Sequence, residues 1–327
     1  MEFNLNQPHD LIFRATLSDQ HRADAILRAH LEPWLGALLA DELPVPLDGT
    51  FVDEELRASQ SDKLLQVTLR SGQPAFVYAL LEHKSYSDPG TALQLWKYKA
   101  RIWEAYARGE ADRLRALPAI VPLVFYHGRQ PWTAPRSIAA MVSGQDERLQ
   151  ALEPTFGYFL RDLGHIPVER LAADPAARAG LLVLRYSHRG EEAGDEKLAA
   201  LPEILAALPD ESDFERQVVV YLMSVWNVRR LTLSAAAEAA KPGRGEAMVG
   251  HVVQELLDEG KTAGLTEGLT TGRADSLTQL LEHRFGQLPE AVQRLIASAS
   301  QAELATWFTA ALDATSLVAV FEGHALD

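Results

Sequence analysis

The sequence contains no cysteine among its 327 residues. A disulfide framework, a thiol nucleophile and a cysteine-ligated zinc site are therefore excluded, and any metal must be held by Asp, Glu, His or carbonyl oxygens. Long hydrophobic runs are also absent, since none approaches the roughly 20 residues that span a bilayer. The start, Met-Glu-Phe-Asn-Leu-Asn, lacks the basic and apolar regions of a signal peptide. We therefore expect a cytoplasmic protein with no membrane partner.

Positive charge is in short supply: 31 Lys and Arg stand against 45 Asp and Glu, a formal net charge of -14. Taken alone, this balance argues against a nucleic-acid partner, because phosphate binding depends on clustered Lys and Arg. The distribution along the chain changes that conclusion. Residues 61–115 hold nine Lys and Arg against six Asp and Glu, so this stretch is locally +3. A local basic surface on an acidic protein remains compatible with DNA.

What is present is the composition of an ordinary globular protein, with 47% hydrophobic and 23% charged residues. The length suits about two domains. Apolar residues at helical spacing from 26 to 38 predict a helix that ends near Glu42, before Pro44 and Pro46. Residues 63–69 alternate as in a strand, 70–74 form a turn, and 75–81 form a second, fully apolar strand.

The pattern after this hairpin continues with an amphipathic helix over 91–108 and an apolar strand over 120–126 that contains Pro122. Strand, strand, helix, strand predicts a mixed α/β core. Further helices are predicted over 153–163, 168–186, 196–208 and 212–226, with linkers at 187–194 and 241–245. A capping box formed by Ser300 and Glu303 and a helix end at Gly286 mark a helical tail.

A cluster of charged residues at the end of the predicted hairpin carries the chemistry. If the turn is centred on Gly72, Asp62 faces Glu82, and Lys84 points the same way as Glu82 while His83 points away. Mg²⁺ takes oxygen ligands, so Asp62, Glu82 and the carbonyl of His83 would suit it. Such an ion polarises a phosphate and activates water, and Lys84 would orient that water or stabilise developing charge.

Each short motif is weak alone. The non-catalytic alternative is a surface salt bridge between Asp62 and Lys84 at a strand end, which contributes little to stability. That alternative does not explain why the charges follow a seven-residue buried strand directly.

Several motifs occur in a fixed order along the chain, and together they are far more specific than any one of them. They are Pro8-His9-Asp10-Leu-Ile-Phe13, Ser61-Asp62-Lys-Leu-Leu65, Leu80-Leu81-Glu82-His83-Lys84-Ser85, Leu93-Gln94-Leu95-Trp96-Lys97-Tyr98, and Pro118-Ala-Ile-Val-Pro122 through Tyr126-His127-Gly128 and Trp132. Together they resemble the Rpn, or YhgA-like, recombination-promoting nucleases of the PD-(D/E)XK superfamily, over roughly residues 8–190. Ser61 stands where the superfamily motif has Pro, a change shared by many members of the family.

The resemblance implies a PD-(D/E)XK core with a mixed sheet flanked by helices and a C-terminal helical extension. We therefore expect a nuclease domain over 1–190, a helical region over 191–250 and a Gly-repeat and helical extension over 251–327. It also implies a DNA endonuclease dependent on Mg²⁺ or Mn²⁺ that promotes recombination or acts on mobile DNA, with Asp62, Glu82 and Lys84 catalytic. The alternatives are a non-catalytic module that binds DNA or a protein, and a nuclease acting on RNA.

Residues outside the catalytic cluster receive supporting roles, either by the same resemblance or, for the basic residues, from their place on one side of the predicted helix. Gln94 and Tyr98 are similar to a Gln-x-x-x-Tyr element that helps position DNA, or they are simply part of a helix surface. Asp10 is either a first-helix metal ligand or, with His9, a helix cap. Lys97, Arg101 and Arg108 either follow phosphates or form a solvated helix face.

Glycines at 260, 264, 268 and 272 recur every four residues. On a helix each costs about 0.8 to 1 kcal/mol against alanine, so such a helix needs a packing partner. The two interpretations are close helix pairing in a homodimer through the C-terminal helices and a flexible tether between the nuclease core and the tail.

Overall fold

The computed structural model describes residues 7–47, 62–82, 87–108, 110, 112–142, 152, 154–187, 194–314 and 316–321. At positions 62, 78–82, 194, 256, 259, 260, 262–269 and 313 it describes the backbone alone. The chain divides into two compact units, Met1–Val252 and Val253–Asp327. Within the described ranges, no helix combines the length and the hydropathy that crossing a membrane requires.

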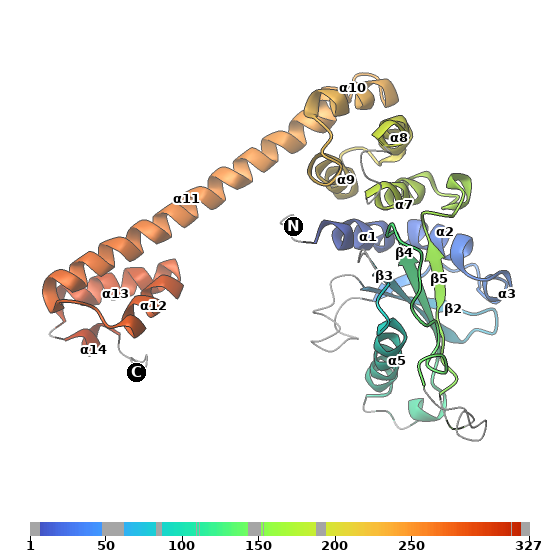
Figure 1. Ribbon diagram of the computed structural model, residues 1–327, viewed down its shortest axis with the longest axis horizontal. Helices are drawn as coiled ribbons and strands as arrows, with labels where there is room; N and C mark the ends of the chain where they lie inside the picture. The colour runs from blue at the N-terminus through green and yellow to red at the C-terminus, as the bar shows by residue number, and fades with distance from the viewer. Residues whose placement is uncertain are drawn as a thin grey trace. The chain divides into compact units, whose positions relative to one another are not determined.

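A five-stranded mixed sheet forms the centre of the first unit (Figure 1). Its strands lie side by side in chain order: β1 (Val45–Leu47), β2 (Asp62–Thr68), β3 (Pro74–Glu82), β4 (Ala119–Tyr126) and β5 (Phe159–Asp162). β1, β2 and β3 pair antiparallel, whereas β3, β4 and β5 pair parallel. Parallel neighbours need a crossover connection. The sequence-based prediction of a mixed α/β sheet is therefore confirmed.

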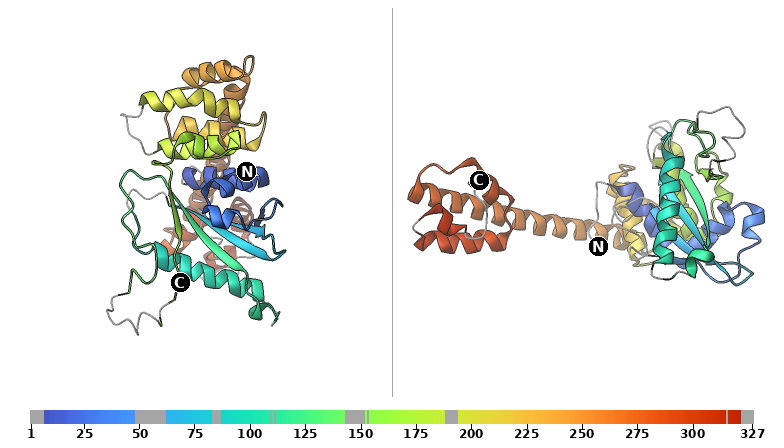
Figure 2. Two further views of the ribbon diagram at one scale, coloured as in Figure 1. Left: turned by 90° about the vertical axis from the view of Figure 1, so that its right-hand side faces the viewer. Right: turned by 90° about the horizontal axis from the view of Figure 1, so that it is seen from below.

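Helix α5 (Thr91–Ala107) forms that crossover and covers one face of the sheet, here called the α5 face (Figures 1 and 2). The predicted amphipathic helix is confirmed: its apolar stripe is buried while Lys97 is exposed. Because side chains alternate along a strand, one row of positions from each of β2, β3 and β4 belongs to this face. The resulting cluster joins Ala92, Leu95 and Ile102 of α5 to Leu64, Phe76, Ile120 and Val124 of the strands.

Helices α1 (Pro8–Ser18), α2 (Gln20–His30) and α7 (Pro175–Ser187) pack over the opposite face, here called the α1 face. Phe125 of β4 is fully buried there, with ring centroids of Phe13 and His30 at 5.5 and 5.1 Å. α1 and α7 approach closely, because a Cβ added at Gly180 would lie 2.3 Å from Thr16 Oγ1. This layer holds much of the large apolar side-chain surface of the unit.

One predicted helix ends earlier than expected, and another is wrong. The helix expected to reach Glu42 ends at His30, because Glu32 precedes a proline and the residue before proline disfavours the helical region. A single turn, α3 (Pro33–Gly36), follows. The segment 153–163 contains β5 instead of a helix, since it pairs with the open edge of β4 from Leu123 onward. Short apolar segments do not distinguish the two structures by periodicity alone.

The predicted helix over 168–186 is confirmed only from Pro175. The side chain of Asp174 accepts a hydrogen bond from the Ala177 amide at 2.7 Å, and a proline at the first helical position needs no donor. Residues 168–170 form a short 3-10 turn instead. The later helices of the unit are α8 (Gly194–Ala207), α9 (Asp213–Ser224) and α10 (Arg230–Ala240), close to the predicted ranges where these existed.

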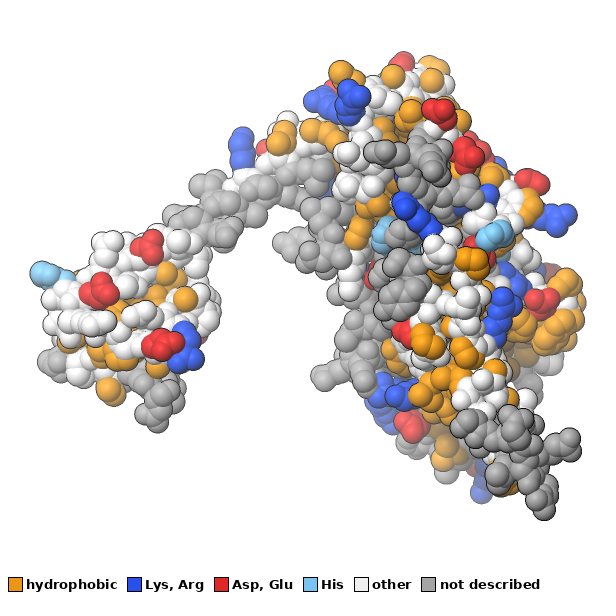
Figure 3. Space-filling view, viewed as in Figure 1, with side chains coloured by type: hydrophobic (Ala, Val, Ile, Leu, Met, Phe, Trp, Pro, Cys, Tyr) orange, Lys and Arg blue, Asp and Glu red, His pale blue; other side chains and the backbone are white. Residues whose placement is uncertain are grey.

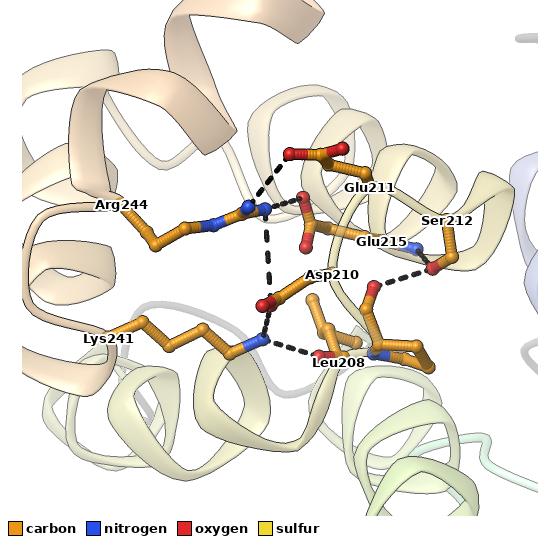
Figure 4. A network of polar contacts seen from close by, with 8 residues as sticks. Leu208, Asp210, Glu211, Ser212, Glu215, Lys241 and Arg244 are labelled. Atoms are coloured by element: carbon orange, nitrogen blue, oxygen red, sulfur yellow. Dashed lines mark hydrogen bonds and ion pairs between the residues drawn. The ribbon is translucent and has the colours of Figure 1, made fainter.

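An ionic network ties the turn after α10 to the connection between α8 and α9 (Figure 4). Lys241 Nζ lies 2.5 Å from Asp210 Oδ1, and Arg244 lies 3.0 Å from Glu211 and 3.4 Å from Glu215. Burial raises the pKa of Glu215, and the cations Arg244 and Lys241 oppose that rise. The predicted boundary at 241–245 is thus a turn fixed by charge pairs.

The second unit is helical, as predicted. Its elements are α11 (Gly245–Phe285), which begins in the first unit, α12 (Glu290–Ser298), α13 (Gln301–Asp313) and α14 (Leu317–Val320). The capping box of Ser300 and Glu303 is present, and Gly286 ends α11 with φ 79° and its N–H donating to the Glu282 carbonyl. The four glycines spaced by four residues lie within α11 and are helical.

Candidate functional site

The β2–β3 register corrects the predicted pairing. Asp62 lies opposite Leu80, not opposite Glu82. The turn is tighter than expected because the Gly72 N–H donates to the Leu69 carbonyl at 2.7 Å, which centres the turn one residue earlier. Moving the centre by one residue shifts each partner by two. Glu82 therefore lies two residues, which is one repeat of the strand, beyond Leu80, the partner of Asp62.

A shift of two residues keeps both positions in the same row of the sheet. Side chains alternate with period two, so positions 62 and 82 belong to the row of Leu64 and Phe76, on the α5 face. Glu82 also pairs with Tyr126, the last residue of β4. The start of β2 and the carboxyl ends of β3 and β4 thus form one edge, here called the site edge. Lys84 and His83 lie outside the described residues.

Helix α5 presents a polar stripe. Gln94, Lys97, Tyr98 and Arg101 follow helical spacing of three and four, so they share one side of α5. Gln94 Nε2 donates to the Tyr98 hydroxyl at 3.3 Å, and the half-buried Tyr98 ring packs on the α5-face cluster. Lys97 is exposed and Arg101 is half-buried. The first turns of α5, which carry Gln94, follow the end of β3 after eight residues and so lie near the site edge. The helix then runs away from this edge, since Trp103 Nε1 donates to the Pro118 carbonyl directly before β4.

The Tyr126-His127-Gly128 sequence at the end of β4 has a steric reason. The Tyr126 hydroxyl donates to the Gln130 carbonyl at 2.6 Å, and the ring packs on Trp132. A Cβ on residue 128 would lie 2.2 Å from that hydroxyl, so only glycine fits without a shift. This packing fixes the end of β4 next to Glu82.

A buried polar network lies behind the site edge on the α1 face. His127 Nδ1 lies 2.9 Å from Ser187 Oγ, whose hydroxyl donates to the Leu184 carbonyl at 2.6 Å. His127 Nδ1 therefore acts as the donor to Ser187. His9 Nδ1 lies 2.5 Å from the Tyr221 hydroxyl, and its ring centroid lies 5.2 Å from that of His127. Burial raises the pKa of Tyr221, with a hydrogen bond to Ser187 opposing, so its hydroxyl stays protonated at neutral pH.

The sequence did not reveal this network. His9 and Tyr221 are separated by 212 positions, and no local spacing links them. The motifs that contain His9 and His127 were the only available signal. The network brings the first turn of α1 to the level of the site edge, because His127 follows the last residue of β4.

Asp10 lies in that first turn and is only 1% exposed. The helix-cap interpretation of His9 and Asp10 is wrong: the N-cap of α1 is Gln7, and His9 contacts Tyr221 instead. Among the described side chains, no group of three or more His, Asp or Glu residues is placed to hold a metal. Carboxylates at position 62, position 82 and Asp10 are nevertheless hard oxygen donors of the kind that Mg²⁺ prefers.

The fold and this edge define the class. Two antiparallel strands followed by a crossover helix and a parallel strand, with acidic positions where the strands meet, form a PD-(D/E)XK-like core. The family model described as "Putative transposase, YhgA-like" matches residues 7–216. The chain belongs to this YhgA-like family. No solved structure matches the chain.

Curated relatives sharpen the comparison. The chain is 34% identical to the recombination-promoting nuclease RpnD of Escherichia coli O157:H7 over 135 residues, which cover 40% of this chain and 50% of RpnD. It is 34% identical to RpnA of E. coli K12 over 37% of this chain and 40% of RpnA. It is 24% identical to the inactive recombination-promoting nuclease-like protein RpnE of E. coli K12, over 87% of this chain and 93% of RpnE. The matches to RpnD and RpnA thus span half or less of those proteins.

Proposed function

We propose that this protein is a metal-dependent DNA endonuclease with its catalytic centre at the site edge. The observation that carries the proposal is the register, because β2, β3 and β4 bring positions 62 and 82 into one row at one edge of the sheet. The polar stripe of α5 begins in the first turns of that helix, which follow the end of β3. The names of RpnD and RpnA, both recombination-promoting nucleases, support this class of activity.

The chain's own groups would divide the work as follows. Asp62 and Glu82, with the carbonyl of His83 and a buried acid at Asp10, would hold Mg²⁺ or Mn²⁺. When bound, the ion would supply Lewis-acid activation of the phosphodiester and of the attacking water. Lys84 would stabilise the negative charge that develops on the phosphoryl oxygens as the phosphorus–oxygen bond breaks. Gln94, Tyr98, Lys97 and Arg101 would position the DNA strand beside that bond.

Cleavage of supercoiled plasmid tests the proposal directly. The parent, Asp62→Asn and Glu82→Gln are incubated with Mg²⁺, with Mn²⁺ and with EDTA, after circular dichroism has shown equal folding. We expect nicking that requires metal and is lost in both variants. Folded variants that cut as fast as the parent, or no cutting with either ion, contradict it. A matched RNA substrate separates DNA from RNA cleavage.

A non-catalytic module is the second candidate, and one observation favours it: RpnE, which matches most of this chain, is named inactive. This candidate predicts DNA or protein binding by the folded chain without cleavage under any metal. The plasmid assay and a binding assay on the same sample therefore distinguish the two. The chain retains Asp62, Glu82 and Lys84, and this favours the enzyme. A cytoplasmic location stays a prediction.

We also propose that the chain forms a homodimer through α11. Its four regularly spaced glycines lie in helical backbone, where they cost stability unless another surface packs on them. Light scattering at micromolar concentration should give twice the chain mass of 36.0 kDa. Gly264→Leu with Gly268→Leu should return the monomer mass by blocking close approach. If light scattering gives the mass of a monomer for the parent chain, the homodimer proposal is contradicted.

A further inference from the structure

The last residue of β5, Asp162, lies on the same edge of the sheet as the proposed catalytic centre. Asp162 pairs with Tyr126 of β4, and Tyr126 pairs in turn with Glu82 of β3. Neighbouring strands lie about 4.8 Å apart, so the backbone at 162 is about 10 Å from the backbone at 82. Leu160, two residues before Asp162, packs on the α5-face cluster. Because side chains alternate along a strand, positions 82, 126 and 162 follow one another along the α5 side of the site edge.

The turn that follows β5 is held from two sides. Within the turn, the His165 N–H donates to the Asp162 carbonyl at 3.0 Å. From α7, the Arg185 guanidinium donates to the Leu163 carbonyl at 2.9 Å and also to the Ile166 carbonyl. These bonds fix the backbone before and after His165. The shape of the turn therefore depends on groups other than the His165 ring.

The His165 ring is exposed, yet one of its nitrogens is held. Nδ1 lies 2.9 Å from Oδ2 of Asp162, while Oδ1 of Asp162 accepts a hydrogen bond from the Gly164 N–H at 3.0 Å. An ionised carboxylate only accepts hydrogen bonds, so Nδ1 is a protonated nitrogen. The His165 side chain is 81% exposed, whereas that of Asp162 is 21% exposed. Nε2 therefore lies on the far side of the ring from Asp162, where the ring is open to solvent.

Stability gives little reason for this pair. Exposed ion pairs contribute little to the free energy of folding, and a ring that is 81% exposed buries little apolar surface. A histidine whose Nδ1–H is held by a carboxylate is also the arrangement by which proteins present Nε2 to a ligand or a substrate in a fixed direction. The exposed Nε2 is thus placed to meet a group outside the protein.

A phosphate group suits Nε2 of the protonated ring. Both nitrogens of an imidazolium are donors, so Nδ1 can keep its bond to Asp162 while Nε2 donates to an anion. Such bonds between ionised groups are about twice as strong as neutral ones. The charged groups that hold the turn are Asp162 and Arg185, one of each sign. On the face drawn in Figure 3, Lys and Arg side chains are interspersed with Asp and Glu, so single contacts of this kind matter for DNA binding.

The spacing along the edge matches a nucleic-acid strand. One strand carries a phosphate about every 3.4 Å of helix axis, so about 10 Å corresponds to about three nucleotides. A strand that is cut beside position 82 and follows the edge past Tyr126 would therefore bring another of its phosphates to His165.

We propose that His165, oriented by Asp162, binds a phosphate of the DNA strand about three nucleotides from the cleaved bond. This rests on the proposed endonuclease function, which it deepens by adding a strand-positioning contact that depends on pH. Only the protonated ring donates through both nitrogens, and histidine changes its charge near neutral pH. DNA should therefore bind more tightly at pH 6 than at pH 8.

Binding of a labelled single-stranded oligonucleotide is measured by fluorescence anisotropy in EDTA, where no cleavage occurs, at both pH values. The test variant is His165→Gln, and the matched control is His21→Gln, at an exposed position in α2. We expect the parent and the control to bind about three- to tenfold more tightly at pH 6 than at pH 8, and the test variant to lose most of this difference. The slope of log affinity against log salt should fall by about one in the test variant at pH 6 and stay unchanged at pH 8.

A variant of opposite sign guards against misfolding. His165→Lys carries its charge at both pH values, so at pH 8 it should bind about as tightly as the parent does at pH 6, a gain that an unfolded protein cannot give. His21→Lys adds the same charge elsewhere and should change binding by less than about twofold. If His165→Gln keeps the pH dependence of the parent, or if His165→Lys binds no more tightly at pH 8 than His21→Lys, the proposal is overturned.

The source of the phosphate and the link to cleavage are tested separately. Sodium phosphate and sodium chloride of equal ionic strength should weaken oligonucleotide binding equally. A stronger effect of phosphate on the parent than on His165→Gln assigns the site to a free anion and overturns the strand contact. If the parent never cuts plasmid but the His165 variants change binding as expected, the endonuclease fails and the phosphate contact stands. If the parent cuts and the His165 variants bind like their controls, the contact fails and the endonuclease stands.

Discussion

The α1 face and the α5 face of the sheet reach the site edge with different kinds of side chain. On the α1 face, Phe13, His30 and Phe125 are almost completely buried, and His127 and Tyr221 belong to the buried polar network behind the edge. On the α5 face, Gln94 and Tyr98 are half-buried and Lys97 is exposed. The comparison teaches that the α1 face packs tightly behind the edge, whereas the α5 face keeps polar and exposed side chains. Each prediction below tests this separation.

The largest expected effect is on the α1 face. Phe125→Ala removes a fully buried ring that contacts Phe13 and His30, and this type of change costs about 3 to 5 kcal/mol. Urea unfolding followed by circular dichroism measures the loss. A loss below about 1 kcal/mol would show that the α1 face does not dominate stability.

The next effect is on the α5 side of the edge. Asp62→Asn or Glu82→Gln should lower the DNA cleavage rate by about 10²- to 10³-fold, the usual size for losing one electrostatic group at a reacting centre. Single-turnover plasmid cleavage with excess protein gives the rate. Parallel urea unfolding checks that the loss is chemical. A variant that loses activity only in proportion to its folded fraction contradicts the separation of the two faces.

A pH effect of intermediate size is expected from His30. Its pKa is lowered from 6.5 to about 4, mainly by burial and also by the charge of Arg161, while the hydrogen bond to the Leu171 carbonyl opposes this. His30 therefore binds a proton below about pH 6.5 in the unfolded chain but only below about pH 4 in the folded chain. Stability from this group is present above pH 6.5 and falls as the pH drops through that window, by about 2 kcal/mol between pH 8 and pH 5.

His30→Gln isolates this effect, because glutamine can still donate to the Leu171 carbonyl but cannot take up a proton. Urea unfolding at pH 8 and pH 5 should show a smaller pH-dependent loss in the variant than in the parent. His283→Gln, at an exposed position in α11, serves as the control. Equal pH dependence in parent and His30→Gln would show that His30 is not its source.

The smallest effect is expected from Tyr98→Phe. It removes the hydroxyl that accepts from Gln94, and a neutral hydrogen bond contributes about 0.5 to 1.5 kcal/mol. We expect cleavage at low DNA concentration to slow by about two- to tenfold. Tyr106→Phe, on the same helix near its other end, should have no effect. Equal behaviour of the two variants would assign Gln94 and Tyr98 to a plain helix surface.

Much of the central sheet could be predicted from the sequence, because local patterns determine it. The alternation of 63–69, the apolar run of 75–81 and the stripe of 91–108 each specify an element without help from the rest of the chain. The register was predicted two residues off because it depends on which residues close the turn around Gly72, a choice that hydrophobic periodicity leaves open.

The failures share a physical cause, which is packing between distant segments. β5 forms because β4 offers an open parallel edge, and the segment around Phe159 carries no strong signal of its own. The hydrogen bond between His9 and Tyr221 likewise arises only when α1 and α9 pack together. The acidic positions could be found from motifs, whereas the residues that hold the edge from behind could not.

The distance in sequence between His9 and Tyr221 also has a consequence for biosynthesis. A ribosome adds about 5 to 20 residues per second, so the partner of the first helix emerges at least ten seconds after that helix. Until α9 follows, His9 lacks its hydrogen-bond partner Tyr221, although β2, β3 and β4 have already been made. The edge is therefore completed late, and a nascent chain that stops before α9 would carry its acidic motifs without their support.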